Sequence, residues 1–388
     1  MRDLYLSKIQ LKAELERCLN CKTQPCMKAC PVNCSPQEFI NHAKNSNFDD
    51  AVKTITNNNL MGQTCGLICP DKFCMKACTR ANIDFAVNIP KVQATILENY
   101  RIKKEDYSGA SHNGMSVAII GAGPAGIAAA PVLVNMGYKV AMFEASDKVG
   151  GALNMIPESR LPYNVIEKDW DYIFDEDYIS LELNKKIDNL EELLAKFDGI
   201  IVATGEPNSI SLNVPGEEHS ISYKEYLLNP EKYKTDGKVA IIGGGNVAAD
   251  CAFTAKINGA SSIEMFVRRR LSDMKISKKE YMELIDYQVD ISVLNSPQKI
   301  EKKGKTFSLF VGKNHFIDGK IEQVPNSTIE LPSFSLIIKA IGSRADPKIE
   351  NERIIYAGDC KHGGSTIVEA ISSGRSAAVF LNAKLTRV

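Results

Sequence analysis

Ser116-Val-Ala-Ile-Ile-Gly-Ala-Gly-Pro-Ala-Gly126 decides the fold of this 388-residue chain. Five strand-forming residues run directly into three glycines with the spacing Gly-x-Gly-x-x-Gly, and an alanine-rich segment follows. Gly121 permits a tight turn, Gly123 lets the backbone approach a pyrophosphate, and Gly126 lets a helix pack closely on the strand. The stretch predicts a strand, a turn and a helix whose N-terminus receives phosphate charge.

The residues that follow strengthen the dinucleotide interpretation. Lys139–Phe143 is typical of a second strand and ends at Glu144, where an acid holds ribose hydroxyls. Just beyond, Gly150-Gly151 suits a backbone that passes close to the same cofactor. A glycine turn with a packed helix and no ligand is the alternative. The strand before, the helix after and the acid at this distance favour a nucleotide.

Three further segments repeat the buried-strand pattern, at Asp198–Ala203, Lys238–Ile242 and Ser335–Ala340. Their alternation with helical stretches predicts doubly wound α/β domains with parallel sheets. Residues 291–333 differ, because short alternations punctuated by glycine predict strands and hairpins. Residues 101–114 are charged and then rich in Gly, Ser and Asn, which is typical of a linker.

A second glycine loop, Gly243-Gly-Gly245-Asn-Val-Ala248, also follows a strand. The next strand, Ile263–Val267, ends in Arg268-Arg269-Arg270 instead of an acid. Guanidinium groups at this place suit a 2′-phosphate, so NADPH is favoured over NADH. The alternative is a solvated basic strand end.

Composition narrows the class of protein. The chain has 47 basic and 47 acidic residues, which gives no reason to expect nucleic acid or an anionic membrane as partner. No apolar run is long enough to span a bilayer, and residues 1–14 contain no signal-peptide core. The expectation is a cytoplasmic protein of two or three domains. Eleven cysteines in such a protein are not expected to form disulfides.

Eight of those cysteines form two quartets near the start. They are Cys18-(x2)-Cys21-(x4)-Cys26-(x3)-Cys30-Pro31 and Cys65-(x3)-Cys69-Pro70-(x3)-Cys74-(x3)-Cys78. The first is close to the ferredoxin run C-x2-C-x2-C-x3-C-P, whose fourth cysteine serves the other of two clusters. Structural zinc and a Cys18/Cys21 redox dithiol are the alternatives. The pattern favours iron–sulfur clusters.

A cysteine segment followed by two dinucleotide fingerprints resembles the family of the glutamate synthase small subunit and the N-terminal electron-input half of dihydropyrimidine dehydrogenase. The resemblance covers essentially the whole chain. It implies a helical domain at 1–110 with two [4Fe–4S] clusters, an FAD domain at 115–205 and 336–388, and an inserted NAD(P)H domain at 206–335.

The resemblance also implies crosswise ligand sets. One cluster uses Cys18, Cys21, Cys26 and Cys78. The other uses Cys30, Cys69, Cys74 and a residue downstream, which is a glutamine in the dihydropyrimidine dehydrogenases and matches Gln93 here. Four cysteines are then left as non-ligands: Cys34, Cys65, Cys251 and Cys360. The alternative for Gln93 is a solvent-facing helix residue.

The C-terminal part matches a further flavin stretch of that family. Asp359 corresponds to the acid that bonds the ribityl chain, and a helix starting near Thr366 aims its positive end at the flavin ring. Hydride transfer needs no protein acid or base, so no catalytic side chain is assigned. The expected cofactor-binding residues are Gly121, Gly123, Pro124, Ala125, Gly126, Glu144, Gly151, Arg160, Leu161, Thr204, Gly205, Gly243, Gly245, Asn246, Val247, Arg268, Arg269, Gly358, Asp359 and Thr366.

The expected function is electron input from NAD(P)H through FAD and the clusters to a partner subunit. That partner is the FMN-barrel subunit of a dihydropyrimidine dehydrogenase, which the match at Gln93 favours. The alternative is the glutamate synthase large subunit. A disulfide reductase is disfavoured because residues 115–388 contain only Cys251 and Cys360. A scaffold with vestigial nucleotide folds is disfavoured because the glycines of both fingerprints are intact.

Overall fold

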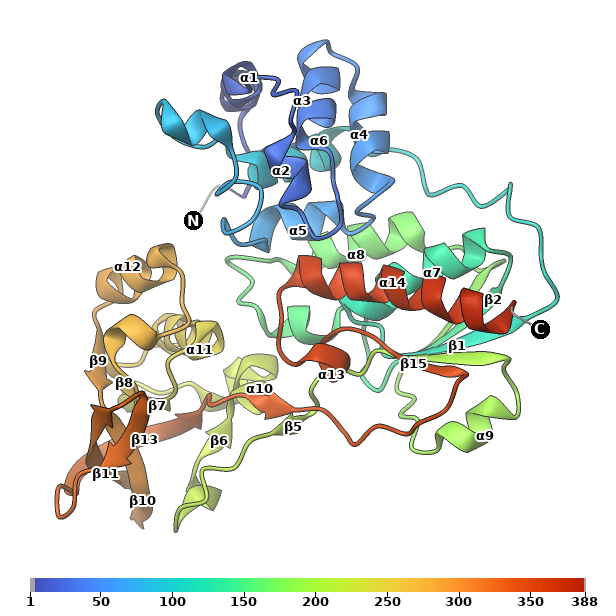
Figure 1. Ribbon diagram of the computed structural model, residues 1–388. Helices are drawn as coiled ribbons and strands as arrows, with labels where there is room; N and C mark the ends of the chain where they lie inside the picture. The colour runs from blue at the N-terminus through green and yellow to red at the C-terminus, as the bar shows by residue number, and fades with distance from the viewer. Residues whose placement is uncertain (1–3, 387–388) are drawn as a thin grey trace. The chain divides into compact units, whose positions relative to one another are not determined.

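The computed structural model describes residues 4–386, apart from the side chains of Lys278 and Lys279. The chain forms two compact units. The first contains residues up to 154, residues 158–207 and the residues from 345 onward. The second contains residues 155–157 and 208–344 (Figure 1).

The cysteine segment is helical, as its short apolar-periodic stretches predict. Ser7 forms a capping box with Gln10 at its first helix, and prolines occupy the first turn of three others. These helices are short, so the loops between them carry most of the cysteines. The elements are α1 (Lys8–Arg17), α2 (Pro25–Lys28), α3 (Pro36–Lys44), α4 (Phe48–Thr56), α5 (Gly62–Ile68), η1 (Thr79–Asn82) and α6 (Ile89–Tyr100).

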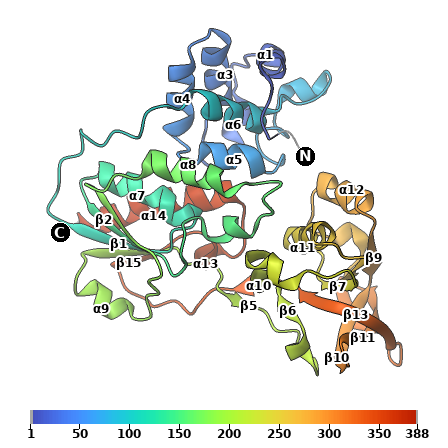
Figure 2. The same cartoon turned by 180° about the vertical axis from the view of Figure 1, so that it is seen from behind.

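A five-stranded parallel sheet with the order β15-β4-β1-β2-β3 completes the first unit. Its strands are β1 (Ser116–Ile120), β2 (Lys139–Phe143), β3 (Ile179–Glu182), β4 (Gly199–Val202) and β15 (Ile354–Tyr356). The surrounding helices are α7 (Pro124–Asn135), η2 (Gly151–Met155), α8 (Tyr163–Ile173), α9 (Leu190–Leu194), α13 (Asp359–His362) and α14 (Ile367–Leu385). Helices α7 and α14 lie side by side in both ribbon views (Figure 2). A Cβ at Gly374 would meet Ala125 O at 2.0 Å, so glycine permits this close approach.

The sheet of the second unit is mixed. Strands β13, β7, β8 and β9 are parallel, while β11 pairs antiparallel with β10, β12 and β13. This confirms parallel strands at the second glycine loop and hairpins at 291–333. The strands are β5 (Asn208–Ser209), β6 (Ile221–Ser222), β7 (Lys238–Ile242), β8 (Ser262–Val267), β9 (Val289–Val293), β10 (Asn295–Lys303), β11 (Thr306–Ile317), β12 (Lys320–Gln323), β13 (Ile329–Lys339) and β14 (Ser343–Arg344). The helices are η3 (Glu217–His219), α10 (Tyr223–Leu228), η4 (Pro230–Tyr233), α11 (Asn246–Ile257), η5 (Leu271–Asp273) and α12 (Lys278–Asp286).

Buried polar contacts join the cysteine segment to helix α8 of the first unit. The Arg101 guanidinium at the end of α6 pairs with Asp169 of α8, and their side chains are 4% and 0% exposed. The second carboxylate oxygen of Asp169 accepts from the backbone N–H of Thr64 in α5 at 2.8 Å. One buried acid therefore holds two helices of the cysteine segment.

Helix α14 makes a second set of contacts with the cysteine segment. Ser372 Oγ donates to Pro31 O at 2.9 Å, directly after Cys30. Arg375 donates to Asn58 O at 2.9 Å, and Glu369 lies 3.7 Å from Lys72. Residues of both cysteine runs therefore contact α14, whose N-cap is Thr366.

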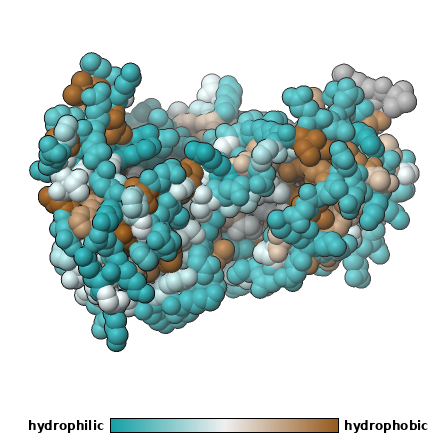
Figure 3. All heavy atoms as spheres, turned by 90° about the horizontal axis from the view of Figure 1, so that it is seen from below, coloured by the Kyte–Doolittle hydropathy of each residue, from teal (hydrophilic) through white to brown (hydrophobic). Residues whose placement is uncertain are grey.

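The surface seen in Figure 3 is mainly hydrophilic, with hydrophobic residues in separate patches. Within residues 4–386, no helix has both the length and the apolar character that crossing a bilayer requires.

Candidate functional site

Four predicted ligands surround one pocket in the cysteine segment. Cys18 ends α1, Cys26 lies in α2, and Cys78 precedes η1. Together with Cys21 they line the pocket, although Cys78 is distant from the others in sequence. We call these four residues, Cys18, Cys21, Cys26 and Cys78, the outer thiols. The structure thus brings together the crosswise set that the family resemblance implies, while ligation itself stays a prediction.

The outer thiols are half-buried and electrostatically coupled. Burial raises the pKa of the Cys18 thiol, and the neighbouring Cys21 and Cys78 raise it further. Burial likewise raises the pKa of Cys26, with smaller contributions from Cys18 and Cys78. Thiolates gathered this closely need a nearby positive charge, which metal ions supply.

Three more predicted ligands, Cys30, Cys69 and Cys74, form a second group that we call the inner thiols. Burial raises the pKa of Cys74, and Cys69 and Cys30 add to the rise. Burial also raises the pKa of Cys30, although hydrogen bonds from the backbone N–H groups that follow it partly offset the rise. Backbone N–H groups of this kind stabilise a thiolate.

Gln93 is buried against Cys34, whose thiol interacts with those of Cys30 and Cys74. It lies on α6 with 7% of its surface exposed, so the alternative of a solvent-facing residue is wrong. Its Nε2 donates to Gly62 O at 2.7 Å, and its Oε1 accepts from Cys34 Sγ at 3.6 Å. Cys34 and Cys65, which are expected to be non-ligands, are also buried here. Gln93 as the eighth ligand stays a prediction.

The number of outer thiols equals the number of ligands that one [4Fe–4S] cluster takes. Within residues 4–386, no three His, Cys, Asp or Glu side chains converge closely enough to hold a single metal ion. A [4Fe–4S] cluster is a cube of several atoms held by four thiolates. The outer thiols surround a pocket, which fits such a group. None of the eleven cysteines forms a disulfide.

The first glycine loop has the close contacts that its sequence predicts. A Cβ at Gly121 would lie 2.5 Å from Ala203 O, and one at Gly126 would lie 1.9 Å from Gly121 O. Gly123 caps α7, with Pro124, Ala125 and Gly126 in its first turn, and Gly151 lies against it. The Glu144 carboxylate accepts from the backbone N–H of Ala122 at 2.8 Å. Backbone N–H groups, a carboxylate and a helix N-terminus therefore meet at one place.

Two further observations fit a cofactor at this loop. Among the described side chains, Asn154 Oδ1 is buried without a hydrogen-bond partner, beside Gly150. Gly205 follows the exposed Thr204 and has open space where a Cβ would be. A buried acceptor without a hydrogen-bond partner in the chain commonly bonds to a group that is not part of the chain, such as a water molecule or an ion. The residues present therefore fit FAD.

The C-terminal residues of the predicted flavin site are brought to the same sheet. Gly358 lies against Ala125, with a φ of 69°. Asp359 accepts from Ser365 N at 3.1 Å, and burial raises the pKa of its carboxyl. Thr366 is the N-cap of α14, as predicted. Of the other two expected residues, Leu161 is a core residue with 2% of its surface exposed, and Arg160 is half-buried with a polar partner.

The second glycine loop repeats the geometry in the second unit. A Cβ at Gly243 would lie 2.2 Å from Ala340 O, while Gly245 at the N-cap of α11 faces open space. Val247 is partly exposed, and the Asn246 amide can donate to Lys275 O and Glu280. At the end of β8, Arg268 and Arg269 are exposed, and neither guanidinium has an ion-pair partner among the described residues.

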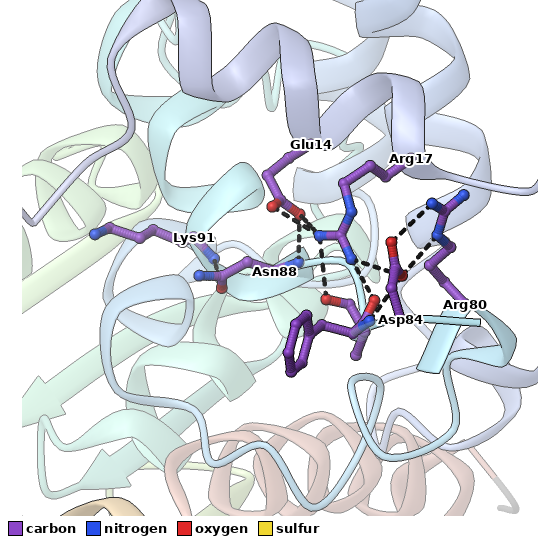
Figure 4. A network of polar contacts seen from close by, with 8 residues as sticks. Glu14, Arg17, Arg80, Asp84, Asn88 and Lys91 are labelled. Atoms are coloured by element: carbon purple, nitrogen blue, oxygen red, sulfur yellow. Dashed lines mark hydrogen bonds and ion pairs between the residues drawn. The ribbon is translucent and has the colours of Figure 1, made fainter. Parts of the chain in front are cut away.

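Sequence reasoning missed a polar network at the rim of the outer pocket. Arg80 lines the pocket and binds Asp84 through two hydrogen bonds of 2.8 Å (Figure 4). Arg17, directly before Cys18, reaches the same carboxylate at 3.1 Å. Thr79 Oγ1 lies 2.9 Å from Cys21 Sγ. The one sequence signal for this network is that Arg17 and Thr79 directly adjoin the pocket cysteines Cys18 and Cys78.

Two protein families match successive parts of the chain. Residues 2–105 match the family "Dihydroprymidine dehydrogenase domain II, 4Fe-4S cluster". Residues 115–374 match the family "Pyridine nucleotide-disulphide oxidoreductase". The first match covers the cysteine segment, and the second covers both glycine loops.

Individual relatives cover nearly the whole chain. The NAD-dependent dihydropyrimidine dehydrogenase subunit PreT of Escherichia coli K12 is 31% identical over 94% of this chain and 92% of its own. The glutamate synthase [NADPH] small chain of the same organism is 27% identical over 95% of this chain and 90% of its own. The structure of Mycobacterium tuberculosis FprA in complex with NADPH shares the fold, with a TM-score of 0.61, 18% identity and coverage of 70% and 84%.

These matches and the grouped thiols identify the protein's class. The chain has a [4Fe–4S] cluster domain and an FAD- and NAD(P)-binding region. It is therefore an oxidoreductase that belongs to the family of the dihydropyrimidine dehydrogenase N-terminal region and the glutamate synthase small chain.

Proposed function

We propose that the chain is the electron-input subunit of a dihydropyrimidine dehydrogenase. It oxidises NAD(P)H and delivers the electrons to a catalytic partner subunit. The grouping of seven cysteines into outer and inner thiols carries the proposal, because each group would hold one cluster. When bound, FAD accepts the hydride's electron pair and the clusters carry electrons one at a time.

In this proposal the two thiol groups each hold one [4Fe–4S] cluster. The outer thiols supply all four ligands of one cluster, and the inner thiols supply three ligands of the other. Gln93 Oε1 completes the inner set, since it is buried and positioned by its bond to Gly62. Each Cys-Met-Lys-Ala-Cys repeat then contributes one outer and one inner thiol.

The flavin is held by the first glycine loop in this proposal. The N–H groups at the start of α7 face the pyrophosphate, and Glu144 accepts from the ribose hydroxyls. Asp359 accepts from the ribityl chain. The positive end of α14, a helix of 19 residues, faces the isoalloxazine and stabilises negative charge there. No titrating side chain is required for the hydride step.

The second glycine loop binds the pyridine nucleotide, and Arg268 and Arg269 select NADPH. Both guanidinium groups are exposed at the end of β8. The Arg270 guanidinium, by contrast, forms an ion pair with Asp273 and lies over the Phe316 ring. Replacing Arg268 and Arg269 together by Ala raises KM for NADPH about tenfold or more and leaves KM for NADH unchanged. Steady-state kinetics with ferricyanide measure both constants, and an equal effect on the two nucleotides would contradict the assignment.

The proposed domains are a cluster domain at 1–110, an FAD domain at 115–205 and 336–388, and an NAD(P)H domain at 206–335. The structure divides the chain near both crossings, at 207 and 344. Gln93 and the similarity to PreT favour the pyrimidine branch. The similarity to the glutamate synthase [NADPH] small chain, with the paired arginines, makes that complex the second candidate.

Anaerobic purification tests the proposal directly. The protein should contain stoichiometric FAD and about eight irons per chain, as two cubane clusters require. It should reduce ferricyanide with NAD(P)H, and form dihydropyrimidine only after a catalytic dihydropyrimidine dehydrogenase subunit is added. Zinc in place of iron would refute the clusters, and glutamate formation with a glutamate synthase large subunit would support the second candidate.

A further inference from the structure

The loop at 83–86 exposes its apolar side chains to solvent. Its one acidic side chain instead binds two arginines. Ile83 is 66% exposed and Phe85 is 80% exposed. Between them, Asp84 is bound by Arg80 and Arg17 (Figure 4). This reverses the usual preference of apolar side chains for the interior.

The same network fixes the backbone of this loop. Arg17 donates to Phe85 O and, at 3.5 Å, to Ala86 O, while Asp84 Oδ1 accepts from Phe85 N at 2.7 Å. Glu14 orients Arg17 at 2.9 Å and accepts from the backbone N–H of Asn88 at 2.8 Å (Figure 4). Exposed ion pairs contribute little to stability, but such a network lowers the entropy that the loop loses on binding.

The loop lies beside the outer thiols. It is flanked in sequence by Arg80 and Val87, which both line the outer pocket. Leu19 also lines that pocket and is 44% exposed. We call these three exposed side chains the apolar patch: Leu19 lies at the pocket itself, and Ile83 and Phe85 lie on the loop between two residues that line it. Exposed apolar side chains with a polar surround are typical of protein interaction sites.

Three exposed lysines lie close in sequence to the outer thiols. Lys22, Lys28 and Lys76 are exposed, and each lies within two residues of an outer thiol. The nearby acids Glu14 and Asp84 are neutralised by Arg17 and Arg80. A partner with acidic groups around an apolar centre complements this surface. A second copy of this chain would bring the same lysines to the interface, which disfavours self-association.

We propose that Leu19, Ile83 and Phe85 are the docking centre for the protein that accepts electrons from the outer thiols' cluster. Lys22, Lys28 and Lys76 form its basic rim and steer an acidic partner. The inference rests on the proposed function, because it takes the outer cluster as the point where electrons leave. A rigid exposed aromatic residue beside that cluster would anchor the acceptor in a fixed position.

An acidic flavodoxin serves as the protein probe, since its FMN absorbance reports electron arrival. The holoenzyme is assayed with NADPH and either flavodoxin or ferricyanide. In the double variant Ile83→Ser/Phe85→Ser, KM for flavodoxin should rise about tenfold while ferricyanide reduction is unchanged. The matched control is Ile102→Ser, which removes a side chain that is 88% exposed on the linker and should change neither assay.

Charge-reversal variants and the oligomeric state, measured by sedimentation, complete the test. Lys22→Glu/Lys28→Glu should lower the flavodoxin rate and weaken its salt dependence. An unchanged KM in the Ile83/Phe85 variant, or an equal loss in Ile102→Ser, would overturn the docking proposal. A wild-type dimer that Phe85→Ser converts to a monomer would also overturn the docking proposal, since a second copy of the chain would then occupy this surface. A wild-type protein that fails to reduce ferricyanide would instead refute the proposed function.

Discussion

Each copy of the repeated pentapeptide contributes one outer and one inner thiol, but the two groups of thiols occupy different surroundings. The outer thiols line a pocket at the surface, with a network of exposed charges at its rim. The inner thiols are flanked by buried Cys34, Cys65 and Gln93 and lie next to α14. Solvent exposure and hydrogen bonds to sulfur set the potential of an iron–sulfur cluster. The different surroundings therefore predict different potentials for the two proposed clusters.

Removing one thiol from each group gives the largest effects. Cys26→Ser and Cys74→Ser should each lower the iron content from about eight to about four per chain. Either variant should slow flavodoxin reduction about 100-fold. EPR of the reduced protein should retain the inner signal in Cys26→Ser and the outer signal in Cys74→Ser. Loss of both signals in both variants would contradict two independent sites.

Two arginine substitutions compare how much a buried ion pair and a more exposed one contribute to stability. Arg101→Gln leaves Asp169 buried without its cation, so the free energy of unfolding should fall by about 3–5 kcal/mol. Arg17→Gln should cost about 1 kcal/mol or less, because its partners are exposed. Urea unfolding of the holoprotein measures both. The control is Lys168→Gln, an exposed ion pair with Glu98 on the same two helices.

Gln93 tests the coordination of the inner cluster. Gln93→Ala should shift the potential of the inner signal by about 60 mV, a tenfold change in the one-electron equilibrium, and leave the outer signal unchanged. Gln93→Glu, which keeps an oxygen at this position, should retain the full iron content. If Cys34→Ser alters the inner signal and Gln93→Ala does not, then Cys34 is the ligand, since it lies next to Gln93 Oε1.

The smallest expected effect concerns Lys72. Its ion pair with Glu369 is exposed on both sides, so Lys72→Gln should lower the free energy of unfolding by less than about 1 kcal/mol. High salt should remove the difference between this variant and the wild type. A large effect that persists in high salt would show that Lys72 is part of the inner site itself.

Local patterns predicted both nucleotide folds because their causes are local. The strand at 116–120, its glycines and the helix that follows are neighbours in sequence, so spacing alone identifies them. The crosswise thiol sets came from family resemblance, because Cys78 reaches the outer pocket only through folding. The network at the rim could not be predicted, since Arg17 and Asp84 are 67 residues apart and neither occurs in a recognisable motif.

The contacts of α14 have a consequence for the order in which the protein is made. Ser372 bonds Pro31 across 341 residues, and Arg375 bonds Asn58 across 317. During synthesis the N-terminal segment leaves the ribosome first, long before α14 exists. The cysteine segment therefore exists without its contacts to α14 until nearly the whole chain is complete.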